Sequence, residues 1–241
     1  MLAGVLAPTL AVLRLDAVTL AAQSGPILAA SLMGTGMIAA AVAARFWVGV
    51  ALALTTSVGL IALAQRLGMA PLAHPLSTTL ALLVASISFA ARGTLFTRAH
   101  PRHGWIIAVL VVCGEAATLL TAAWLPTWLP TWLLVLLPAQ WASTAIATAI
   151  VGSGTRAAMA VLVALAGTAA TTLLVARLLP RKWPYALMFT AWLAFSALVA
   201  RHPAPTLKRT QSLNELRSRY FECTMSDAHR NTACQPLSND R

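Results

Sequence analysis

Seven apolar runs, each close to the length of a membrane-spanning helix, constrain this sequence more than any other feature. A transmembrane helix needs about 20 mostly apolar residues to cross a hydrocarbon layer roughly 30 Å thick. The runs cover residues 27–44, 46–64, 77–91, 105–124, 128–151, 157–179 and 183–200. They predict an all-α fold, a polytopic transmembrane helix bundle of about seven spans with a range of six to eight.

Composition supports the same class of protein. Of the 241 residues, 59% are apolar and only 10% are charged, whereas a soluble domain is roughly half apolar and a quarter charged. A disordered chain and a disulfide scaffold are excluded because each needs a composition that this sequence lacks. The bilayer is therefore the first expected partner of the chain.

The chain divides into three expected regions. Residues 1–25 are an apolar segment too short to span, which we expect to be interfacial or partly inserted. Residues 26–200 form the helix bundle, and residues 201–241 form a polar, basic, partly disordered tail. Only Arg45 separates the first two runs, so we expect the first helix to start upstream near Asp16. Within the tail, Ser212 to Glu215 is a capping-box pattern that predicts a short basic helix on the membrane surface, with disorder as the alternative.

The basic residues predict an orientation but no nucleic-acid binding. The net charge is +11, and nearly all basic residues before the tail lie at the ends of apolar runs, where they meet lipid headgroups. With seven alternating spans, one side receives Arg45, Arg92, Arg98, Arg102 and Arg156, and the other receives Arg14, Arg66, Arg177, Arg181 and Lys182. The tail adds five basic residues to the first side. The positive-inside rule then places the tail and the loop up to His103 in the cytoplasm, and the composition suits a bacterial inner membrane.

Glu115 is the strongest candidate for a functional residue. It is the single acid inside any of the seven runs, and a carboxylate near the bilayer midplane is costly unless it is paired, hydrated or protonated. In a proton- or cation-coupled carrier, the Glu115 carboxylate would titrate as the gate of the carrier moves. The alternative is a neutral Glu115 that hydrogen-bonds to Thr118, Thr121 or a neighbouring helix. Gln140 lies midway along the fifth run and could face Glu115 across a helix pair.

A second candidate site lies in the loop after the third run. Arg98, His100, Arg102 and His103 could together hold a phosphate or a lipid headgroup. The alternative is a solvated basic loop, because phosphate sites normally recruit backbone donors as well. We expect no metal and no cofactor, since no histidine lies within a predicted span and no metal-ligand, Walker or Rossmann motif occurs.

Two functions from different classes follow. The first is a non-enzymatic accessory or structural subunit of a membrane complex, which packs against other membrane proteins, or itself, through the alanine-rich faces of the fifth and sixth runs. The second is a small carrier or permease with Glu115 as its proton- or cation-coupling residue. An enzyme is not expected, because the spans hold one acid and no histidine. A carrier should enclose a polar cavity that reaches Glu115. In a packing subunit, Glu115 should instead be buried against other side chains, with no cavity beside it.

Overall fold

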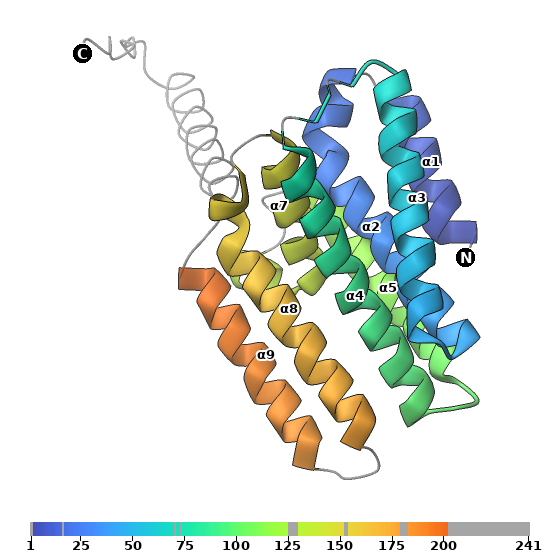
Figure 1. Cartoon of the computed structure of the whole chain (residues 1–241), viewed down its shortest axis with the longest axis vertical. Coiled ribbons are helices and arrows are strands. Elements are labelled where there is room, and N and C mark those ends of the chain that lie inside the picture. The colour runs from blue at the N-terminus through green and yellow to red at the C-terminus, as the bar shows by residue number, and fades with distance from the viewer. Residues whose placement is uncertain are drawn as a thin grey trace, which may run out of the picture.

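The computed structural model is an elongated bundle of α-helices (Figure 1). It describes residues 2–15, 17–69, 71–72, 74–124, 130–151, 154–178 and 183–201, and no strand occurs within these ranges. The helices are α1 (Leu2–Arg14), α2 (Ala17–Ala43), α3 (Phe46–Arg66), α4 (Pro75–Ala99), α5 (Gly104–Trp124), α6 (Thr131–Leu136), α7 (Pro138–Val151), α8 (Gly154–Leu178) and α9 (Trp183–Arg201). The expected tail helix lies outside the described residues.

Within the described residues, five helices are long and apolar enough to cross a membrane, so the chain has the architecture of a multi-pass membrane protein. The five candidate spans are Gln23–Ala43, Phe46–Arg66, Pro75–Ala99, Gly104–Ala122 and Met159–Leu178. In α9, Met188–Arg201 is a shorter apolar stretch. The all-helical class is confirmed, but the count of about seven spans is not.

Helices α1 and α2 precede the first tight turn of the chain. The expected upstream start of the first long helix is confirmed, because α2 begins at Ala17 and passes through Pro26. A turn at Ala44, which adopts a positive φ of 52°, and Arg45, in an extended conformation, leads into α3. The shorter α1, about 20 Å long by its residue count, packs on α2, where Gly4 meets Gly34 so closely that a Cβ on Gly4 would lie 2.7 Å from the Gly34 carbonyl carbon.

The fifth apolar run is not one helix, contrary to the prediction of a span over residues 128–151. Helix α6 ends at Leu136, Leu137 is extended with φ −90° and ψ 114°, and α7 starts at Pro138. The cause is Pro138, which lacks an N–H for the helical ladder and disfavours helical geometry in the residue before it. Within the described residues, neither piece is long enough to cross a bilayer.

This break changes the direction of the helices that follow. The Thr97 hydroxyl donates to the Ala41 carbonyl, so α2 and α4 end at the same end of the bundle. Arg98 Nη1 donates to the Ala176 carbonyl at 2.8 Å, so α8 also ends there. Figure 1 shows these C-terminal ends together at the bottom. The predicted sidedness, with Arg98 and Arg177 on opposite sides, is therefore wrong, because the run that should have separated them does not span.

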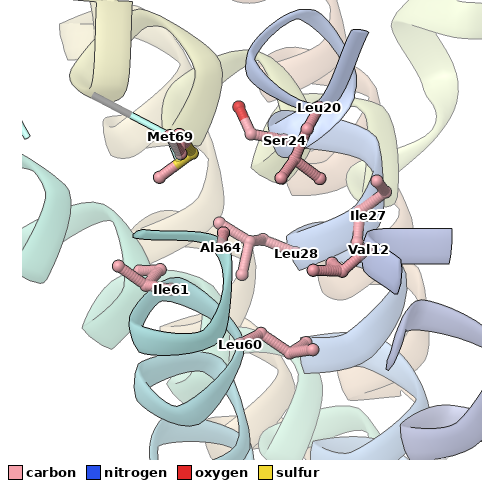
Figure 2. Close-up of a pocket in the computed structure, with 9 residues that line it drawn as sticks. All are labelled: Val12, Leu20, Ser24, Ile27, Leu28, Leu60, Ile61, Ala64 and Met69. Carbon is pink, nitrogen blue, oxygen red and sulfur yellow. The ribbon is translucent and has the colours of Figure 1, made fainter. Parts of the chain in front are cut away.

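The core is built around α2 from small side chains. In its candidate span 72% of the residues are buried, against 17% in the span of α5. The alanine faces expected to meet a helix or a partner subunit are buried in part, where α7 packs on α2, α4 and α8 and where α8 packs on α4, while Ala166 and Ala170 on α8 are exposed. Figure 2 shows a small apolar cleft of about 10 Å³ where Val12, Leu28, Leu60 and Met69 converge, too tight for more than a solvent-sized molecule.

Candidate functional site in the membrane-spanning region

Glu115 is paired, and its partner is a residue that sequence reasoning assigned to a loop. Arg92 Nη1 on α4 lies 3.7 Å from Glu115 Oε1 on α5, and the two side chains are only 13% and 14% exposed. Arg92 was expected outside the membrane because the third apolar run stops at Ala91. Instead α4 continues through Arg92 to Ala99, since Arg92 is followed by further residues that can be buried.

The hairpin register explains why these two residues meet. Helices α4 and α5 are joined by the turn 100–103, in which the Gly104 N–H donates to the His100 carbonyl at 2.7 Å. Arg92 precedes this turn by about two helical turns and Glu115 follows it by about three, and the long arginine stem covers the remaining offset. The short loop between the two helices is the sequence signal for this pair. Residues at similar distances before and after such a loop lie at similar heights on the two helices.

The surroundings of the pair leave much of its bonding capacity unused. The Arg92 guanidinium carbon lies 5.6 Å from the centroid of the Phe89 ring, a cation–π contact. The Glu115 Oε2 atom is buried and has no hydrogen-bond partner among the described residues.

A cavity of about 350 Å³ adjoins the pair. Its polar lining comes from Arg92, Glu115, Thr168, Thr171 and Thr172. Its apolar lining comes from Leu95, Phe96, Val111, Leu136, Leu137, Pro138, Met188 and Trp192. The break between α6 and α7 therefore forms part of the wall, as do α4, α5, α8 and α9. A volume of this size is in the range of small-molecule sites.

The three threonines of the lining all lie on α8. Thr168 donates its hydroxyl proton to the Leu165 carbonyl, Thr171 to that of Gly167 and Thr172 to that of Thr168. A hydroxyl that donates within its own helix keeps only its acceptor lone pairs for other partners. Thr168 and Thr172 are buried and Thr171 is half-buried, so Thr171 is the threonine best placed to accept from a ligand.

The other predicted site residues lie elsewhere. Gln140 is half-buried on α7, does not line the cavity, and has no hydrogen bond to Glu115 within the ranges described. The hydroxyls expected near Glu115 donate to backbone carbonyls instead, Thr118 to that of Glu115 and Thr121 to that of Ala117.

The basic loop is not assembled as a headgroup site. Arg98 reaches across to the last turn of α8 and satisfies a carbonyl there, while His100, Arg102 and His103 are exposed around a tight turn. In the part of the chain that the structure describes, no group of three or more His, Cys, Asp or Glu side chains is placed to hold a metal ion.

Comparison of the chain with models of known protein families, with curated proteins and with solved structures found no match. The site must therefore be interpreted from its own geometry. That geometry defines a multi-pass membrane protein with an ion pair in a cavity among its spans.

Proposed function

We propose that this protein is a small carrier or permease that binds its substrate at the Arg92–Glu115 pair. The observation that carries the proposal is the 350 Å³ cavity at an intramembrane acid. Ionisable residues inside a membrane are rare, face cavities and mark substrate or ion pathways. A subunit that used Glu115 only for packing would have no need of a space beside it.

The broken helix supports the same function. In many carriers, discontinuous helices place half-helix ends and irregular backbone at the substrate site near the bilayer midplane. Here Leu136, Leu137 and Pro138, at the α6–α7 break, line the same cavity as Glu115. A short helix beside a break can change position at lower cost than a continuous span, because few backbone hydrogen bonds tie it to its neighbour.

The accessory-subunit function remains the second candidate. Of the alanines expected to meet a helix or a partner, Ala142, Ala145, Ala149 and Ala164 are at most 1% exposed inside the chain, whereas Ala166 and Ala170 are exposed on α8. Native sizing after mild detergent extraction tests it. A stoichiometric membrane partner that travels with the protein would favour this function over transport.

Location and orientation are proposed on charge alone. We propose a bacterial inner membrane with the tail in the cytoplasm. Helix α9 runs away from the end that holds Arg177, since α8 and α9 are consecutive and Gly167 lies against Phe195. We therefore propose that the chain after Arg201 lies on the side that holds Arg14 and Arg66. The turn 100–103 then faces the other side, contrary to the sequence-based expectation.

Alternating access is the property that tests the carrier function. In a chain whose natural cysteines, Cys113, Cys223 and Cys234, are replaced by serine, Thr171→Cys places a thiol on the cavity wall. We expect a membrane-impermeant thiol reagent to modify it from either side, in right-side-out and in inverted vesicles. Leu165→Cys, on the same helix but 0% exposed in the core, is the matched control and should not react. Modification of Thr171→Cys from one side only, or from neither, would overturn the proposal.

A further inference from the structure

The bonding capacity left open in the cavity specifies a chemical class of ligand. Arg92 carries five N–H donors, and its contacts in the described residues are the 3.7 Å approach to Glu115 and the face of Phe89. Glu115 lines the same cavity, and within the described residues its carboxylate is approached by a charged donor only at 3.7 Å, from Arg92. The cavity therefore offers a cationic donor and an anionic acceptor side by side.

Charge balance narrows the class further. The pair is neutral as a whole, and a ligand with a net charge would leave an uncompensated charge in a low-dielectric site, which is costly. A ligand with one positive and one negative group keeps the site neutral while it fills both open positions. Its anionic group would accept from the guanidinium, and its cationic group would donate to the Glu115 carboxylate.

The polar lining decides which kind of cationic group fits. A primary ammonium has three N–H donors, more than one carboxylate oxygen can use. Thr171 lines the same cavity and is half-buried, and its hydroxyl, which donates within α8, is left to accept from a ligand. A quaternary ammonium has no N–H donor and would leave the carboxylate without a hydrogen bond.

The remaining wall is apolar. Leu95, Met188 and Trp192 line it, so the ligand's body should be aliphatic or aromatic. We propose that the cavity binds an amphipathic zwitterion, with a primary ammonium on Glu115, a carboxylate or phosphate on Arg92 and an apolar body against Met188 and Trp192. This inference deepens the proposed carrier function, since it assigns a substrate class to the same cavity.

Three compounds with one aromatic body separate the contributions of the charges. Phenylalanine carries both groups, 2-phenylethylamine only the ammonium and 3-phenylpropionate only the carboxylate. We expect phenylalanine to raise the Tm of the purified full chain in detergent, saturably with concentration, because a ligand that binds only the folded state stabilises it. The singly charged compounds should give no saturable shift. Absence of a shift with phenylalanine, or an equal shift with 2-phenylethylamine, would overturn the inference, unless the lipid arm below responds.

A fourth compound distinguishes a free molecule from a lipid headgroup. Dihexanoyl phosphatidylethanolamine presents the same primary ammonium with a phosphate, and its phosphatidylcholine counterpart has a quaternary ammonium instead. A shift with phenylalanine alone identifies a free amino acid as the source. A shift with the ethanolamine lipid, but not with the choline lipid, identifies a headgroup. Equal shifts with both lipids count against the role of the ammonium.

Substitutions then place the binding in this cavity. Thr171→Val removes one acceptor, keeps the charges and the shape, and should weaken phenylalanine binding about five- to tenfold with little change in the Tm of the free protein. Arg92→Gln should abolish the saturable shift, and Arg102→Gln, at an exposed loop position, is the matched control that should retain it. If Arg92→Gln does not fold, Thr171→Val alone decides, and undiminished binding there overturns the inference.

The carrier function and the ligand class fail separately. A saturable phenylalanine shift together with one-sided labelling of Thr171→Cys retains the ligand class and removes the carrier. Two-sided labelling without a shift for any zwitterion retains the carrier and removes the ligand class.

Discussion

At the scale of residues, the Arg92–Glu115 pair should affect stability mainly when one partner is removed. The unpaired charge that remains should cost more than the attraction between the two side chains contributes. Breaking a buried pair by removing one partner leaves a charge without compensation and costs about 3 to 5 kcal/mol in soluble proteins. We expect Arg92→Gln and Glu115→Gln each to lower the free energy of unfolding by about 2 to 4 kcal/mol, somewhat less because the pair adjoins a cavity. The measurement is reversible unfolding in mixed micelles.

The double variant tests the coupling between the two residues. Arg92→Gln combined with Glu115→Gln leaves no charge unpaired, so its loss of stability should be clearly smaller than the sum of the two single losses. Arg102→Gln, at an exposed position, supplies the control for removal of a charge as such. Strict additivity in this cycle would mean that the two side chains do not interact in the folded protein.

The same pair shows how far sequence reasoning reaches at this scale. Glu115 could be identified because an acid in an apolar run is costly wherever the run packs. Arg92 could not be identified by the same rule, since it stands at the end of a run and a helix boundary there was equally consistent with hydropathy. The cavity depends on how six helices, α4 to α9, meet, and no local pattern of residues determines that. The prediction that Gln140 faces Glu115 was wrong for the same reason. Its position midway along a run does not determine which face of the helix carries it.

At the scale of elements, glycine sets the distance between α2 and α4. A Cβ on Gly93 would collide with the Met37 carbonyl oxygen and lie 3.0 Å from the Ala40 Cβ, whereas one on Gly114 would meet nothing within 4 Å. We expect Gly93→Ala to destabilise the protein by about 1 to 3 kcal/mol through overpacking. Gly114→Ala should be neutral or stabilising by up to about 1 kcal/mol, because alanine is the better helix former. Equal melting temperatures for the two variants would contradict the close crossing.

A hydrogen bond between the same two helices gives a second prediction. Thr97 on α4 donates to the Ala41 carbonyl on α2 at 2.9 Å, whereas Thr121 donates at 2.8 Å within its own helix. Interhelical hydrogen bonds in membranes contribute about 1 kcal/mol. Thr97→Val should therefore cost about that much in unfolding free energy and Thr121→Val much less. A cost at least as large for Thr121→Val would show that the cross-helix bond is not what stabilises this end.

Most helices could be predicted from run length, and the exception shows why. Hydropathy measures whether a segment can reside in lipid, so it found the five long spans. It does not measure helical continuity, and residues 131–151 are apolar enough to be counted as one run although Pro138 divides them into α6 and α7. Proline is tolerated within α2, where Pro26 lies inside a continuous helix. Its effect at Pro138 depends on the surrounding packing, which the sequence alone does not reveal.

At the scale of the whole molecule, that one break determines which loops share a side of the membrane. Counting seven alternating spans placed Arg102 opposite Arg177, and the bond from Arg98 to the Ala176 carbonyl brings the two regions to one end. Helices α3 and α9 run opposite to α2 and α8 respectively (Figure 1), so their last residues, Arg66 and Arg201, lie away from that end. The error in one element was thus transmitted to the predicted position of every later loop.

Sided labelling of single cysteines tests this arrangement in the membrane. In the cysteine-free chain, Arg102→Cys and Arg177→Cys should be modified by an impermeant maleimide from the same side, and Arg66→Cys and Arg201→Cys from the other. The physical reason is that a polar loop is accessible only at the interface where its helices end. Leu110→Cys, on the exposed apolar face of α5, should react from neither side because thiolates do not form in lipid. Labelling of Arg102→Cys and Arg177→Cys from opposite sides would restore the alternating seven-span topology and remove the packing of α4 against α8 on which the cavity depends.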